Sequence, residues 1–82
     1  MESEVPFPHP GEVLLEEFLR PAGVSARKLA RHLRVPVRHV EQIIRGERHI
    51  TAQMDYRLTI AYGQSRGFWL NLQRDYDVSR GE

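Results

Sequence analysis

Apolar side chains recur three or four positions apart in five short segments, and proline or glycine residues separate these segments. This spacing puts the apolar residues of a segment on one helical face, as in the pairs Leu14 and Phe18, and Leu29 and Leu33. No stretch shows the sustained alternation of apolar and polar residues that predicts a strand. The sequence therefore predicts an all-α fold of five helices.

Capping and breaking residues set the expected helix limits. Serine and threonine hydroxyls accept hydrogen bonds from unpaired amides in a first helical turn, so we expect Ser25, Thr51 and Ser65 to cap the second, fourth and fifth helices. Pro21 and Gly23 are expected to stop the first helix. In chain order, the expected helices span about residues 11–20, 26–33, 37–45, 52–62 and 66–76.

Length and composition indicate one folded unit with short ends. A chain of 82 residues is sufficient for one domain and too short for two independent cores. Residues 1–8 contain two prolines and scattered acids without periodicity, so we expect a flexible N-terminal arm. The folded domain is expected at residues 9–77, followed by a frayed tail at residues 78–82.

Composition also argues against several classes of function. The chain has no cysteine, which excludes disulfides, thiol catalysis and thiolate zinc sites. His32 and His39 lack further ligands nearby, and no phosphate loop or nucleophile motif occurs, so we expect no metal, no cofactor and no enzymatic activity. No apolar stretch approaches the roughly 20 residues of a membrane span, and no signal peptide is recognisable, so we expect a cytoplasmic protein.

Charge is unevenly distributed along the chain, although the formal net charge is only +1. Residues 1–24 carry five glutamates and one arginine, whereas residues 25–49 carry seven lysines and arginines and two glutamates. A separate basic block is typical of proteins that bind phosphates. An arginine-rich surface that is merely solvated would explain the charge equally well.

The second and third expected helices have the pattern of a helix-turn-helix. Such a motif needs a small residue where the helices cross, a turn of three or four residues, and a second helix that can enter the major groove. Ala30 is the small residue, residues 34–36 form the turn, and Val40 and Ile43 face the core. This leaves four outward side chains on the second helix of the motif, which are Val37, Arg38, Glu41 and Gln42.

These outward side chains are suited to reading bases. Arginine can donate twice to guanine, glutamine can pair twice with adenine, and valine can touch the thymine methyl group. Glu41 can accept from cytosine, orient a neighbouring arginine, or repel phosphate, and the sequence does not decide among these. The flanking basic residues are better placed to bind phosphates and fix the register. They are Arg27, Lys28, Arg45 and Arg48.

The chain from Pro8 to Asp77 resembles HigA-type antitoxins of the XRE-like helix-turn-helix superfamily. The motifs that carry this resemblance are His9–Leu19, Val35–Pro36, Ile43–Arg48, Ile50–Ala52, Arg57–Leu58 and Phe68–Gln73. The resemblance implies a compact, five-helix, lambda-repressor-like domain whose DNA-reading positions fall on Val37, Arg38 and Gln42. In this family the position of Arg34 is usually glycine, and a left-handed backbone there costs a non-glycine residue roughly 1 kcal/mol.

The resemblance also implies partners. It indicates a homodimer that binds an inverted-repeat, double-stranded operator and represses its own operon as part of a type II toxin-antitoxin pair. The expected toxin is a HigB-type, ribosome-dependent endoribonuclease; an orphan regulator without a toxin is the alternative. We expect the dimer interface near the C-terminus, at Trp69, Leu72 and Tyr76, because an exposed aromatic patch there would favour a partner.

Overall fold

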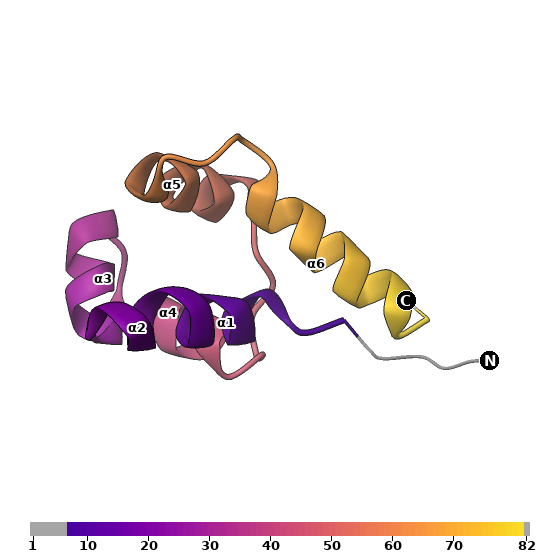
Figure 1. Cartoon of the computed structure of the whole chain (residues 1–82), viewed down its shortest axis with the longest axis horizontal. Coiled ribbons are helices and arrows are strands. Elements are labelled where there is room, and N and C mark those ends of the chain that lie inside the picture. The colour runs from indigo at the N-terminus through magenta and orange to yellow at the C-terminus, as the bar shows by residue number, and fades with distance from the viewer. Residues whose placement is uncertain (1–6, 82) are drawn as a thin grey trace.

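The computed structural model describes residues 7–81, and all regular secondary structure in this range is helical (Figure 1). The expected arm falls mostly on residues 1–6, which lie outside the described residues, as does Glu82 of the expected tail. In chain order the elements are α1 (Pro10–Val13), η1 (Leu14–Leu19), α2 (Arg20–Ala22), α3 (Ala26–Leu33), α4 (Val37–Ile44), α5 (Ala52–Tyr62) and α6 (Phe68–Ser79). The first three follow without a break and form one N-terminal helix, residues 10–22. The described residues thus form five helices and no strand, which confirms the predicted all-α fold.

The N-terminal helix extends past its predicted end. Its middle six residues, Leu14–Leu19, form a π-helix, after which the amide of Arg20 bonds to the carbonyl of Leu15, five residues earlier. Proline in an α-helix clashes with the carbonyl four residues before it, and the wider π turn precedes Pro21 here. The helix therefore continues through Pro21 and ends at Gly23, whose φ of 67° is left-handed.

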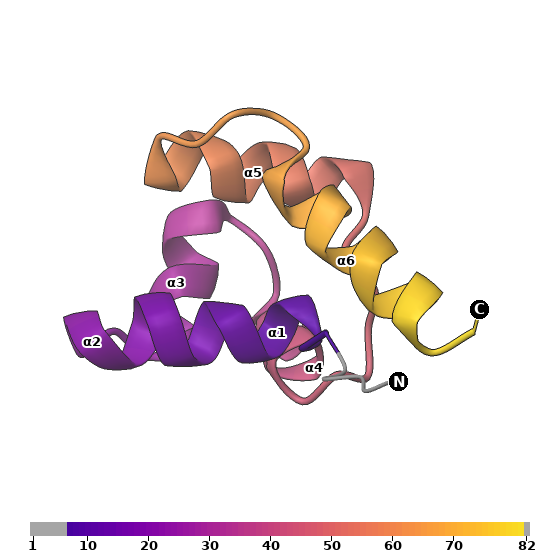
Figure 2. The ribbon, with the colours of Figure 1, turned by 45° about the vertical axis from the view of Figure 1, so that its right-hand side comes forward.

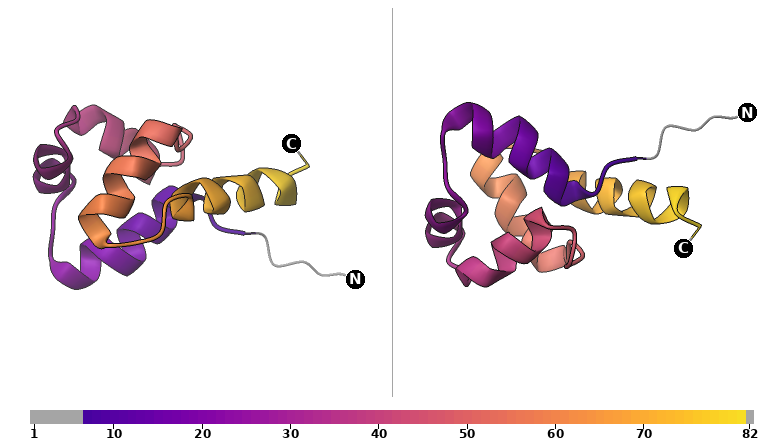
Figure 3. Two further views of the ribbon diagram at one scale, coloured as in Figure 1. Left: turned by 90° about the horizontal axis from the view of Figure 1, so that it is seen from above. Right: turned by 90° about the horizontal axis from the view of Figure 1, so that it is seen from below.

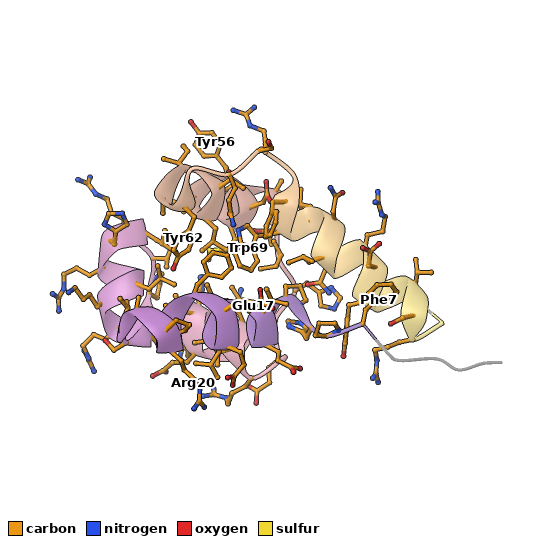
Figure 4. All side chains as sticks on the ribbon, in the orientation of Figure 1. Phe7, Glu17, Arg20, Tyr56, Tyr62 and Trp69 are labelled. Atoms are coloured by element: carbon orange, nitrogen blue, oxygen red, sulfur yellow. The ribbon has the colours of Figure 1, made fainter. Side chains whose placement is uncertain are left out.

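The helices enclose one core, which Trp69 fills at the centre. α3 packs against α4 and α5, while α6 runs from α5 back toward the start of the N-terminal helix (Figure 2). Figure 4 shows Tyr62 and Trp69 between the N-terminal helix and α5, with the Trp69 and Phe18 ring centroids 5.4 Å apart. Trp69 is 0 % exposed. The prediction that Trp69 belongs to an exposed interface patch is therefore wrong, because its ring is enclosed within the protomer.

The start of α6 is capped by a residue from another helix. Both carboxylate oxygens of the buried Asp55 in α5 accept hydrogen bonds, from the amides of Gly67 (2.8 Å), Trp69 (2.8 Å) and Leu70 (3.2 Å). The prediction that Ser65 caps this helix is wrong. α6 itself continues to Ser79, two residues beyond the predicted end of the domain.

His9 joins the start of the N-terminal helix to α6. Its Nδ1 accepts a hydrogen bond from the amide of Gly11 at 2.9 Å. Its ring contacts the ring of Tyr76 edge-on, with the two ring centroids 4.9 Å apart. Burial lowers the pKa of His9, the charge of His49 lowers it further, and Asp77 opposes the shift. Its Nε2 is buried without a hydrogen-bond partner among the described residues. The neutral imidazole is therefore the form that this site favours.

Candidate nucleic-acid interface

The turn between α3 and α4 has the left-handed residue that the resemblance predicts. Arg34 has φ 61° and ψ 46°. Within residues 7–81 it is the one non-glycine residue with a positive φ. The amide of Val35 then bonds to the carbonyl of Ala30 at 3.0 Å, which closes the end of α3. Arg57 of α5 donates to the carbonyl of Leu33 at 2.8 Å. These bonds hold the turn despite the strain at Arg34.

The inner faces of the two helices pack as the sequence predicts. Ala30 and Leu33 of α3, and Val40 and Ile43 of α4, are at most 4 % exposed. Ser25 caps α3 by accepting from the amide of Lys28 at 3.0 Å, which confirms its predicted role. The pair therefore locks together through small and aliphatic side chains, and the opposite face of α4 is left for other contacts.

Gly11 sets the distance between the N-terminal helix and α4. A Cβ atom at this position would lie 1.7 Å from the carbonyl oxygen of Ile43 and 2.9 Å from the Cα of Ile44. Only a residue without a side chain allows this approach, because both neighbours are backbone atoms that cannot rotate away. The last turn of α4 therefore rests directly on the backbone of the N-terminal helix, which orients α4 in the domain.

The predicted base-reading residues lie together on α4. Arg38 and Glu41 are exposed, whereas Val37 and Gln42 are partly buried. No hydrogen bond or ion pair joins Glu41 to Arg38 within the described part of the chain, so the structure gives no support to the option that Glu41 orients an arginine. Arg38 is thus the one basic side chain of this set, and it is exposed.

The predicted phosphate-binding residues divide into two groups. Arg27 and Lys28 are exposed in the first turn of α3. Arg45 follows α4, is exposed, and its Nε lies 3.2 Å from the Oε2 of Glu47. Arg48 is partly buried, and its Nε donates to the side-chain oxygen of Gln42 at 2.9 Å. This last contact was not predicted, since the two residues are six positions apart and joined by a turn outside the helix.

The N-terminal helix presents an acidic surface apart from the basic motif. Glu12, Glu16 and Glu17 are exposed, and Glu16 pairs with Arg20 at 3.2 Å. In Figure 4 Arg20 points away from α5. Such an exposed pair contributes little to the stability of the fold.

Two other kinds of site are absent from the part of the chain that the structure describes. No cluster of three or more histidine, aspartate or glutamate residues between Phe7 and Gly81 could hold a metal ion. In the same range, no helix is both long enough and apolar enough to cross a membrane.

Comparison with known proteins identifies the family. No family model matches the chain. It is 42% identical over 81 residues to virulence-associated protein I of Dichelobacter nodosus, a match that covers 99% of this chain and 75% of that protein. An addiction module antidote protein of the HigA family from Coxiella burnetii has a TM-score of 0.88 and 42% identity, covering 94% of this chain and 84% of that one. The chain belongs to the HigA family.

A second HigA structure includes DNA. The HigA antitoxin of Pseudomonas aeruginosa, solved with the higBA promoter, matches with a TM-score of 0.87 and 40% identity over 92% of this chain and 82% of that one. The relatives of this HigA-family chain whose names state a role are thus antitoxins and helix-turn-helix transcriptional regulators, and not enzymes. The XRE-like helix-turn-helix that the sequence resembles is confirmed.

Proposed function

We propose that this HigA-family protein is the antitoxin of a type II toxin-antitoxin pair and a sequence-specific repressor of its own operon. The observation that carries the proposal is the outward face of α4, where exposed Arg38 lies beside Gln42 on a helix held by a buried seam. The Pseudomonas aeruginosa HigA solved with promoter DNA has the same fold, which supports the assignment of this face to DNA. Val37 and Glu41 complete the proposed base-reading set.

Phosphate contacts are assigned to the exposed basic residues around this face, Arg27, Lys28 and Arg45, and to the free nitrogens of Arg48. The proposed operator lies upstream of the protein's own gene. The DNA of this upstream region is therefore used as the probe. Binding is measured by fluorescence anisotropy at several salt concentrations for the wild type, Arg38→Ala and Lys28→Ala. Arg20→Ala, which removes an exposed arginine from the acidic N-terminal helix, is the matched control.

Base and phosphate contacts give different results in this assay. Arg38→Ala should cost about 1–3 kcal/mol on the operator and relax the preference at one base position. Lys28→Ala should weaken binding to all sequences and reduce the salt slope by about 1. Equal affinity of Arg38→Ala and the wild type for the operator would refute the assignment of α4 as the reading helix.

We infer that the protein binds its operator as a homodimer. A single motif contacts one half-site, whereas a two-fold dimer presents two reading helices about 34 Å apart. In both views of Figure 3 the C-terminal half of α6 extends beyond the other helices, which supports α6 as the interface. Leu72 and Tyr76 remain the proposed contacts, since both are only partly buried in the protomer. Sedimentation of Leu72→Glu should show a smaller species than the wild type.

The second proposed partner is a HigB-type endoribonuclease, met in the cytoplasm. The exposed glutamates of the N-terminal helix, Glu12, Glu16 and Glu17, suit a basic RNA-binding enzyme, because opposite charges favour association. Co-expression with the neighbouring gene and purification through a tag on this protein tests the pair. A complex supports the antitoxin role, and the absence of one would leave an orphan regulator, which is the alternative.

A further inference from the structure

The segment after α4 folds back onto the last turn of that helix. The chain reverses at Gly46, where φ is +75°, and the amide of Glu47 bonds to the main-chain carbonyl of Gln42 at 2.8 Å. Arg48 then lies beside the same glutamine, and its Nε donates to Oε1 of Gln42 at 2.9 Å. Both the backbone and the side chain of Gln42 are therefore held by this segment.

The chemistry of the two groups fixes the orientation of the amide. A guanidinium group has only donors, so the glutamine must present its oxygen and not its nitrogen to Arg48. The amide NH2 of Gln42 then lies on the other side of the planar group, and it makes no hydrogen bond to any of residues 7–81. A glutamine without this contact could turn its amide over and offer either group to a base.

We propose that Arg48 is a positioning residue that makes Gln42 a hydrogen-bond donor toward DNA and so selects guanine at the base it meets. Guanine offers two acceptors, N7 and O6, in the major groove, whereas adenine offers one acceptor and one donor. Pairing twice with adenine needs the amide oxygen as well as the NH2 group, and Arg48 already occupies one of the two lone pairs of that oxygen, whereas pairing with guanine uses only the free NH2 group. The inference rests on the proposed function, and it replaces adenine, which the sequence alone suggested, with guanine.

Arg45 provides the matched control for Arg48. It lies one residue after α4, it is exposed, and its Nε contacts Glu47 and not Gln42. Replacing either arginine removes one positive charge near the DNA. Only the replacement of Arg48 also releases the amide of Gln42, so a difference between the two variants reports on positioning and not on charge.

The test is a set of operators in which each half-site position carries each of the four bases in turn. Binding is measured for the wild type, Arg48→Ala, Arg45→Ala, Gln42→Ala and the double variant Arg48→Ala with Gln42→Ala. We expect the wild type to prefer guanine over adenine by roughly fivefold to tenfold at one position. Arg48→Ala should lose this preference or shift it to adenine, whereas Arg45→Ala should keep it. The double variant should have the same base preferences as Gln42→Ala alone.

Several results separate this inference from the function on which it rests. If Arg48→Ala weakens binding to every operator equally and the preference for guanine persists, Arg48 is a phosphate contact alone and the inference is overturned. The same conclusion follows if Gln42→Ala leaves the preference unchanged. If the wild type shows no base preference anywhere, the proposed function fails as well.

A measurement without DNA checks the same contact. The side-chain amide of Gln42 should be more ordered in nuclear magnetic resonance relaxation of the wild type than of Arg48→Ala, with Arg45→Ala resembling the wild type. Equal order in all three proteins would overturn the inference. Thermal unfolding followed by circular dichroism shows whether each variant is folded, and both arginines are outside the buried core.

Discussion

Replacing Gly11 by alanine should destabilise the domain even though alanine is the better helix former. The added Cβ would lie 1.7 Å from the carbonyl oxygen of Ile43, half the 3.4 Å at which ordinary contact begins. Relief requires the N-terminal helix and α4 to separate, because the obstacle is backbone. Overpacking of this kind costs about 1–3 kcal/mol, and we take the upper end since no side chain can move aside.

Helix propensity offsets part of this cost. Alanine is favoured over glycine by about 1 kcal/mol in a helix interior, which leaves a net loss of roughly 2 kcal/mol in the free energy of unfolding. For a domain of this size that corresponds to a fall in Tm of about 10 °C. Thermal unfolding of Gly11→Ala by circular dichroism measures it, and operator binding should weaken as α4 is displaced.

Gly23→Ala is the control for this substitution. A Cβ at Gly23 meets no atom within 4 Å, and its φ of +67° carries only the conformational cost, roughly 1 kcal/mol. Gly23→Ala should therefore lower Tm by about 5 °C, half the fall expected for Gly11→Ala, and leave operator affinity unchanged. If Gly11→Ala is as stable as the wild type, or more stable, the close contact between the two helices does not limit this position and the reasoning is refuted.

Three further predictions concern single side chains. Asp55→Ala leaves amides at the start of α6 unpaired and should cost about 3 kcal/mol in urea unfolding, whereas Ser65→Ala should cost almost nothing. Arg34→Gly relieves roughly 1 kcal/mol of left-handed strain but raises the entropy of the unfolded state, so we expect a gain of about 0.5 kcal/mol in the free energy of unfolding; a loss would contradict this prediction. Because the folded pKa of His9 is lowered, the unfolded state binds more protons, and stability should fall as pH drops below about 6.5. Unfolding of His9→Asn at about pH 7.5 and about pH 5.5 should show a smaller pH dependence than the wild type.

Most helix limits, and which face of α4 is buried, follow from local sequence. Ser25 and Thr51 cap the helices that they precede, and Val40 and Ile43 face the core, because hydroxyl capping and helical spacing act within a few residues. The left-handed turn at Arg34 was predicted from the resemblance and not from the residue type, since arginine by itself disfavours that conformation.

Features that depend on contacts between distant residues were not predicted. Asp55 caps a helix twelve to fifteen residues later in the chain, and nothing in its local sequence distinguishes it from a solvated acid. Trp69 is predicted from the sequence to lie at a dimer interface. The spacing of apolar residues along one helix does not tell whether another helix of the same chain or a second protomer covers them. The contact between Arg48 and Gln42 depends on a loop conformation, and its one local signal is Gly46, which permits the reversal.

The last helix cannot be removed without harm to what precedes it. Deleting the chain from Gly67 onward would remove all three amide donors of the Asp55 carboxylate in α5, and it would leave the main-chain amide of Ile50 without the Gln73 oxygen that it reaches at 2.9 Å. It would also empty the volume now filled by the indole ring. The proposed reading helix α4 and the C-terminal helix α6 thus belong to one cooperative unit, and we expect a fragment that ends before Gly67 to be unfolded.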